Sequence, residues 1–177
     1  MKKILAIILC VSLALTLVAC GGKKEAEYKL GMGVVVSMES SKTENAQVDA
    51  TVATVVTDAA GKIVSCRIDV AQNKMAVAGG AVDTAKTFET KMELGNDYGM
   101  AGKVDNDGNG VMKEWFEQTK AFETYVVGKT AAEVEAIQTQ EANGHLIATD
   151  KALLDAGCTI QITAINAVMA QAAANAR

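Results

Sequence analysis

VATVVTDAAGKIVSCRIDV, residues 52–70, is the stretch of sequence that decides the fold. Its first part, up to Thr57, is a run of Val, Thr and Ala, and Asp58 to Lys62 then form a turn signal of small residues and glycine. After the turn, apolar residues at positions 64, 66, 68 and 70 alternate with polar residues at 65, 67 and 69. Period-two alternation is typical of a half-buried strand, so the stretch predicts an antiparallel β-hairpin.

The hairpin is flanked by a further strand before it and by helices after it. Val34 to Val36 is a β-branched run that we expect to join the same sheet. Apolar residues at helical spacing predict helices over 84–96, 112–126, 150–155 and 164–176. A capping box at Thr130 predicts another short helix, Asn143-Gly144 a turn, and alternation a short strand over 158–162. Strands first and helices later predict an α+β fold: an antiparallel sheet opened by an N-terminal hairpin, covered by helices, with a C-terminal helix.

The first twenty residues have the features of an export signal. Two lysines precede an apolar run, Ile4 to Ala19, which is shorter than the roughly 20 residues that a membrane-spanning helix needs. The run ends in Leu17-Val18-Ala19-Cys20, and this ending resembles the lipobox of bacterial lipoprotein signal peptides. The resemblance implies that residues 1–19 are cleaved and that the Cys20 thiol receives a diacylglycerol. The alternative is an ordinary cleaved signal with an accidental cysteine.

A lipidated Cys20 fixes the location of the protein. Residues 20–27 become a short lipidated tether, and residues 28–177 a single α+β domain at the extracytoplasmic face of the cell membrane, with the membrane as its partner through the anchor. Stable anchoring takes two acyl chains, and a diacylglycerol supplies both. Without Lys2 and Lys3 the 17 basic residues become 15, against 21 acidic ones, a net charge of −6. Nucleic acid is therefore not an expected partner.

The remaining thiols and the single histidine limit the chemistry. Cys66 and Cys158 are the cysteines left in the mature chain, and the spacing leaves open whether they form a disulfide or are two small buried hydrophobic residues. His145 is the only histidine, so a multi-histidine metal site within one chain is excluded. The GxSxG, HExxH, Walker A and GxGxxG motifs are also absent. An electron carrier or a binding protein is thus expected rather than a stand-alone enzyme.

One polar loop has the pattern of a calcium ligand set. Asp105, Asp107 and Asn109 occupy places one, three and five of the first half of an EF-hand loop, and Gly110 occupies place six. The twelfth place, where a bidentate carboxylate is needed, holds Phe116 instead. The sequence leaves two interpretations open: a weak calcium site, or a solvated turn of Asp, Asn and Gly.

Two segments resemble a known family. Val52 to Val70, and especially Asp58 to Val64, is similar to the hairpin that opens the FMN-binding domain. That domain occurs in the flavin-carrying subunits of sodium-pumping quinone reductases and Rnf complexes and in extracellular flavin lipoproteins. The second motif of that family is Ser/Thr-Gly-Ala-Thr before a helix, and Ala156-Gly157-Cys158-Thr159 stands at the corresponding place near the C-terminus. Ala156 and Cys158 depart from the motif.

The resemblance implies a cofactor and a role. FMN is bound by Gly157, Cys158 and Thr159, with Thr159 as the residue that carries a phosphoester in the family, and Trp115 or Tyr125 supplies an aromatic wall for the ring. The protein is then a membrane-anchored carrier for electron transfer whose partners are membrane redox proteins. The alternatives are a glycine turn with no cofactor, in a non-catalytic surface or binding lipoprotein, and a version of that protein with a calcium-stabilised loop.

The anchor is directly testable. Mass spectrometry of the mature protein is expected to find Cys20 as the first residue, with a diacylglycerol on its sulfur, and Cys20→Ser is expected to release the protein from membranes because no acyl chain remains. An unmodified mature chain that begins at another residue contradicts the prediction.

Overall fold

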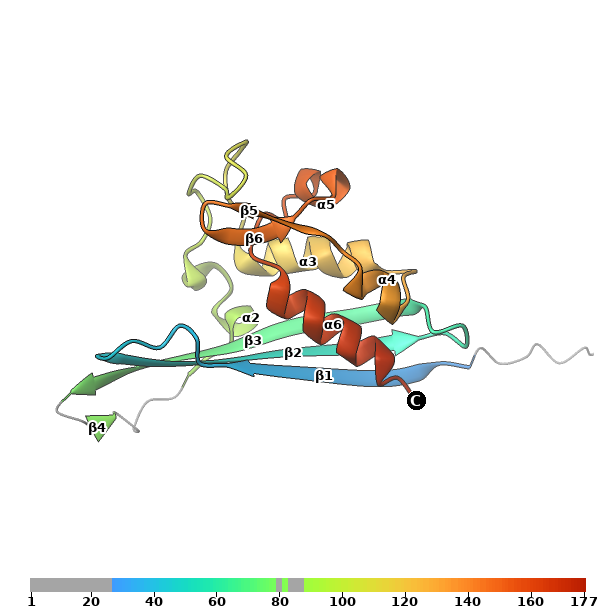
Figure 1. The fold of residues 1–177 in the computed structure, drawn as a ribbon, viewed down its shortest axis with the longest axis horizontal. Helices are drawn as coiled ribbons and strands as arrows, with labels where there is room; N and C mark the ends of the chain where they lie inside the picture. The colour runs from blue at the N-terminus through green and yellow to red at the C-terminus, as the bar shows by residue number, and fades with distance from the viewer. Residues whose placement is uncertain (1–26, 79–80, 83–87) are drawn as a thin grey trace, which may run out of the picture.

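The structure, a computed structural model, describes residues 27–78, 81–82 and 88–177, so the proposed signal and most of the tether lie outside the described residues. An antiparallel sheet in the order β1-β2-β3-β4 forms the base of the molecule (Figure 1). Its strands are β1 (Lys29–Ser37), β2 (Asn45–Thr57), β3 (Ile63–Ala78) and the two-residue β4 (Ala81–Val82). The described helices all lie above one face of this sheet in Figure 1.

The helices and a second small sheet follow β3. The helices are α2 (Lys91–Leu94), the 3-10 helix η1 (Gly95–Tyr98), α3 (Trp115–Val126), α4 (Ala131–Glu135), α5 (Lys151–Asp155) and α6 (Thr163–Ala174). The strands β5 (Thr139–Ala142) and β6 (His145–Ala148) pair with each other in a separate hairpin. The predicted α+β class, with a C-terminal helix, is confirmed.

The predicted hairpin is β2 and β3, and its turn is held by one carboxylate. Asp58 Oδ1 accepts hydrogen bonds from the backbone N–H groups of Ala60 and Lys62, both at 2.9 Å. Gly61 has φ +76°, a conformation that favours glycine. The run at 34–36 belongs to β1 and pairs antiparallel with β2, as expected.

Other predictions were wrong in their limits or their type. The described part of the helix expected over 84–96 is helical only from Lys91, since Thr90 caps it, and residues 84–87 lie outside the described residues. The helix expected from Met112 begins at Trp115, after the cap residue Glu114. Residues 158–162 belong to no described strand: Ile160 lies in a bend, and Ile162 already has helical backbone angles before α6. The short helices at Thr130 and at Asp150 and the turn at Asn143-Gly144 are confirmed.

The C-terminal helix packs closely on β1 because β1 has two glycines on the side that faces it. A Cβ atom added to Gly31 would overlap the Ala172 carbonyl oxygen, and one added to Gly33 would overlap the Val168 carbonyl oxygen. The backbone of α6 therefore touches the backbone of the strand, which no residue with a side chain would permit. This close approach sets the height of α6 above the sheet.

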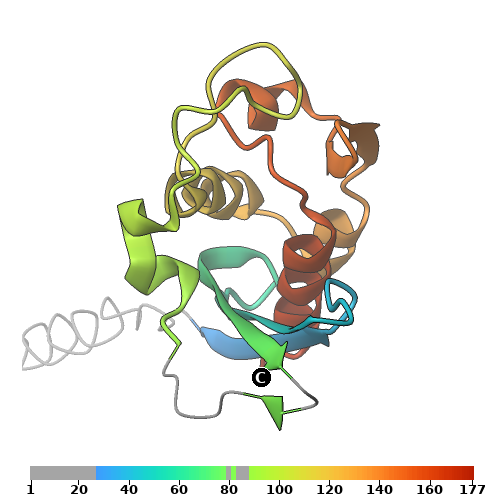
Figure 2. The same ribbon diagram turned by 90° about the vertical axis from the view of Figure 1, so that its left-hand side faces the viewer.

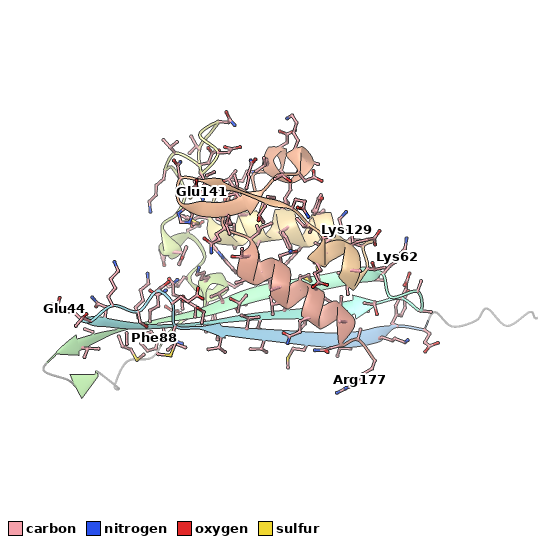
Figure 3. All side chains as sticks on the ribbon, in the orientation of Figure 1. Glu44, Lys62, Phe88, Lys129, Glu141 and Arg177 are labelled. Carbon is pink, nitrogen blue, oxygen red and sulfur yellow. The ribbon has the colours of Figure 1, made fainter. Side chains whose placement is uncertain are left out.

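Residues of α6, α3 and the C-terminal end bind backbone groups on both outer edges of the three long strands. On β1, Val34 N–H donates to Gln171 Oε1 (2.9 Å), Asn175 Nδ2 donates to the Met32 oxygen (3.1 Å), and Arg177 N–H donates to the Leu30 oxygen (3.3 Å). Figure 3 shows Arg177 at this edge. On β3, Ile68 N–H donates to Glu123 Oε1 of α3 (2.9 Å), and Arg67 pairs with the same carboxylate at 3.3 Å. These contacts occupy some of the backbone groups that would otherwise be open to pairing with another chain.

The glycine contact predicts a large effect from a single methyl group. Gly33→Ala is expected to destabilise the protein by about 1–3 kcal/mol, because α6 has to move off the strand. Met32→Thr, at the neighbouring position on the opposite face, is the matched control and should change the free energy of unfolding by no more than about 0.5 kcal/mol. Urea denaturation measures both, and equal stabilities of the two variants would contradict the close packing.

Candidate functional site

The predicted flavin segment lies between α5 and α6, and its backbone is already used. Gly157 has φ +86° and donates its N–H to the Leu154 oxygen at 2.8 Å. Cys158 N–H donates to the Leu153 oxygen, and Thr159 N–H donates to Gln118 Oε1 at 2.9 Å. All three amides that the resemblance offers to a phosphate are therefore engaged within the protein.

Gln118 of α3 holds this segment in place. Its Oε1 accepts from Thr159 N–H and from Ile160 N–H (3.1 Å), and its Nε2 donates to the Lys113 oxygen at 2.8 Å. The side chain is fully buried. Gln118 binds the amides of Thr159 and Ile160, whereas Ile162 N–H donates to the Leu146 oxygen of β6 at 3.0 Å. The segment 158–162 therefore forms no regular strand ladder.

The surroundings of Thr159 do not fit a flavin phosphate. Thr159 is only 3% exposed, and its hydroxyl lies 3.5 Å from Gln118 Oε1. Cys158 is fully buried, and burial raises the pKa of its thiol to about 12. The Lys113 side chain lies against Gly157 and donates to the Ala156 oxygen at 2.9 Å. A phosphoester on Thr159 would need this packing to open, so FMN bound by Gly157, Cys158 and Thr159 has no support from the geometry.

The sequence left two interpretations of residues 105–110, a calcium site or a turn of Asp, Asn and Gly. The structure contains such a turn. Asp105 Oδ1 accepts from Gly110 N–H, and Asp107 Oδ1 accepts from Asn109 N–H, both at 3.1 Å. Burial acts to raise the pKa of Asp107, but hydrogen bonds with Asn109 and Asp105 outweigh it and lower that pKa. Among the described residues no cluster of three His, Cys, Asp or Glu side chains is placed to hold a metal ion. Calcium binding at Asp105, Asp107 and Asn109 stays a prediction.

The two predicted segments nevertheless meet. Asn106 Nδ2, from the candidate calcium loop, donates to the Thr159 oxygen at 2.8 Å.

The two thiols form no disulfide: Cys66 and Cys158 are both free, and Cys66 Sγ lies 3.4 Å from the Glu123 oxygen. The interpretation as two small apolar residues holds in the structure. Burial raises the pKa of the Cys66 thiol to about 12, so the thiol is poorly nucleophilic.

A cleft that the sequence did not predict lies beside the first turn of α6. It consists of two adjoining hollows of about 570 and 190 Å³. Figure 2 shows this end of the molecule, with α6 and α2 on either side above the sheet. Both hollows are lined by Asp49 and Thr51 of β2 and by Gln161, Thr163 and Ala164 at the start of α6. The smaller hollow also reaches Gln72, Lys91 and Trp115.

The floor of the cleft is formed by side chains of β2 and β3 that point toward the helices. This row is apolar in the core and becomes polar where it reaches the cleft. Ala53 and Ile68 face each other across the hairpin and are fully buried in the core. Two pairs further along the same row, Asp49 lies opposite Gln72. A charged residue that continues an otherwise inward-facing row is the sequence signal for this cleft, and it becomes readable only once the register of the hairpin is known.

Asp49 has one carboxylate oxygen without a partner. Its Oδ2 accepts from Gln47 Nε2 at 2.7 Å, whereas Oδ1 is buried and has no hydrogen-bond partner among the described residues. The cation that lines the cleft is Lys91, whose Nζ lies 4.8 Å from the centre of the Tyr98 ring and 5.4 Å from the centre of the Trp115 ring. The cleft thus presents an acceptor, a cation and the edge of an aromatic pair.

Glu114 fixes the wall of the cleft that carries Trp115. Its carboxylate accepts from the N–H groups of Met100 (3.0 Å) and Ala101 (2.9 Å). Burial acts to raise the pKa of Glu114, but these amides and that of Trp115 outweigh it and lower the pKa below its ordinary 4.5. The carboxylate ties the loop before α3 to the start of the helix.

The chain matches no protein-family model, no curated protein and no solved structure. Within the described ranges, none of the helices has the length and the apolar character needed to cross a membrane. Three buried polar atoms of the described residues have no hydrogen-bond partner, Asp49 Oδ1, Thr57 Oγ1 and Asn166 Oδ1, and Asp49 belongs to the lining of both hollows of the cleft.

The hydrogen bonds of Gln118 predict that its replacement lowers the free energy of unfolding strongly. Gln118→Leu is expected to destabilise the protein by about 2–6 kcal/mol, because two buried amides lose their acceptor and each unsatisfied group costs about 1–3 kcal/mol. Gln138→Leu, at an exposed position, is the matched control. Thermal and urea unfolding of the two variants measure the difference, and a stable Gln118→Leu protein would show that the segment is held in another way.

Proposed function

We propose that this protein is a membrane-anchored extracytoplasmic lipoprotein that binds a small polar ligand in the cleft beside α6. The observation that carries the proposal is the buried Oδ1 atom of Asp49, which has no partner among the described residues. An unsatisfied buried carboxylate oxygen costs free energy, and because Asp49 lines both hollows, a rotation of its carboxylate toward a donor group on a bound ligand would recover that free energy. Binding, rather than catalysis, fits a cleft without a nucleophile–base pair.

The chemistry of the lining narrows the ligand class. A donor, such as an ammonium or hydroxyl group, matches Asp49, and the side chains of Gln161 and Thr163 add further hydrogen-bonding groups to the opposite wall. A carboxylate or phosphate on the same ligand would lie near Lys91 and the N-terminal end of α6, where the helix dipole favours negative charge. The proposed ligand is therefore a small molecule that carries both a donor cation or hydroxyl and an anionic group.

A flavin carrier is the second candidate. The larger hollow, at about 570 Å³, lies within the size range of ligand sites, and Trp115 borders the smaller one. FMN would then be held without a covalent bond in the cleft and not at Thr159. The flavin itself would supply the redox chemistry, and the residues of the cleft would orient it.

One purification separates the two candidates. The mature chain is produced in a host able to attach flavins, and its visible spectrum is recorded before and after it is soaked in FMN. A flavin absorption band that survives gel filtration supports the carrier, and denaturation then tells whether the flavin is covalently attached. A colourless protein that gains thermal stability with small zwitterions supports the binding lipoprotein.

Asp49 is expected to separate binding from folding. Asp49→Ala should weaken the ligand found in this way by roughly 10- to 150-fold, since a hydrogen bond to a charged group contributes about 1.5–3 kcal/mol. The ligand-free variant should keep its stability, because the substitution removes an unsatisfied buried oxygen. Asp155→Asn, on the exposed surface of α5, is the control, and isothermal titration measures all three proteins. Equal affinities would show that the ligand lies elsewhere.

A further inference from the structure

The sheet has a second face, and it is apolar and open. Residues of even number on β1 point away from α6, and they are large and exposed: Leu30 (66%), Met32 (58%), Val34 (43%) and Val36 (62%). Tyr28, just before the strand, is 59% exposed. None of the described helices lies on this side of the sheet in Figure 1. A contiguous row of this kind marks an interaction site in soluble proteins.

The row continues onto the neighbouring strand. Leu30 lies opposite Val56, and Val34 lies opposite Val52. We call these six residues the apolar sheet face: Leu30, Met32, Val34, Val36, Val52 and Val56. On β3, the next strand, the row beside this face contains charged residues: Arg67 lies opposite Thr54, and Asp69 lies opposite Val52. The apolar sheet face is thus bounded by a polar row along β3.

Part of the outer edge of β1 is bonded within the protein. Gln171 binds the Val34 N–H, Asn175 binds the Met32 oxygen, and the Arg177 amide binds the Leu30 oxygen. These three backbone groups need no further partner where the strand lies beside an apolar surface.

We propose that the apolar sheet face lies against the lipid bilayer that holds the anchor, with β1 along the membrane surface. The inference rests on the proposed lipid at Cys20. Seven residues separate Cys20 from Tyr28, and a chain of that length reaches at most about 25 Å. The tether therefore ends at the first residue of the exposed row, and it holds that end of the row close to the acyl chains. Tethering of this kind makes a weak surface contact effectively intramolecular.

The orientation has a consequence for the cleft. Asp49 and Thr51 belong to the helix-facing row of β2, on the opposite side of the sheet from Val52 and Val56. With the apolar sheet face on the bilayer, the row of β2 that forms the floor of the cleft faces away from the membrane, and the larger hollow, which Val36 also lines, lies at the end of that face. A ligand in the surrounding medium then reaches it without crossing the lipid surface.

Fluorescence quenching in vesicles tests the docked orientation. The lipidated mature chain, with Cys66→Ser, is reconstituted into vesicles of phosphatidylethanolamine and phosphatidylglycerol that carry nitroxide groups on their acyl chains. A fluorophore is attached either at Met32→Cys, on the apolar sheet face, or at Lys151→Cys, on α5 at the far side of the molecule in Figure 1. We expect several-fold stronger quenching at position 32 than at position 151.

The outcomes are separable. Mass spectrometry of the same sample reads the lipid on Cys20, so an unmodified Cys20 overturns the anchor and the docking together. A lipidated protein with equal, weak quenching at both positions overturns the docking alone. Disulfide-linked dimers through Met32→Cys without quenching identify a second copy of the chain as the occupant, and this also overturns the proposal.

Discussion

The contact between α6 and the two glycines of β1 is the constraint on which the other parts of the structure depend. Because Gly31 and Gly33 let the helix backbone touch the strand, Gln171 reaches the Val34 amide and Asn175 the Met32 oxygen. The same placement brings the first turn of α6 over β2, where Thr163 becomes a wall of the cleft that holds Asp49. One close approach thus covers part of a sheet edge and forms one wall of the candidate site.

Buried polar side chains satisfy the backbone amides of the irregular segments, as strand pairing satisfies those of the sheet. Gln118, Glu114 and Glu123 all lie on or at the start of α3 and are almost fully buried. They bind backbone amides of the segment after α5, of the loop before α3 and of β3 respectively. A chain with only three Phe and one Trp has few large side chains for a core. Its loops are therefore fixed by directed hydrogen bonds more than by volume.

The sequence predicted what local patterns determine and missed what distant partners determine. The hairpin at Asp58, the capping box at Thr130 and the C-terminal helix follow from neighbours in the chain, and the structure contains them. Residues 158–162 alternate like a strand, but the amides of Thr159 and Ile160 are bonded to Gln118, about forty positions earlier, and no periodicity encodes that. The cleft was missed for the same reason, since Asp49 acquires its neighbours from β3 and α6. Thr159 was chosen by resemblance, which takes no account of burial.

The two faces of β1 also tie the beginning of the folded chain to its end. Glycine and large apolar residues alternate along the strand, so a shift of one residue would turn bulky side chains toward α6 and exclude the helix. The hydrogen bond that fixes the correct alignment joins residues 137 positions apart. The first strand therefore reaches its final packing only when α6 docks on it, and this cannot happen before the ribosome has synthesised that helix. A chain that stops short of Gln171 would keep an apolar strand with an unpaired edge, which makes incomplete chains the species prone to aggregate.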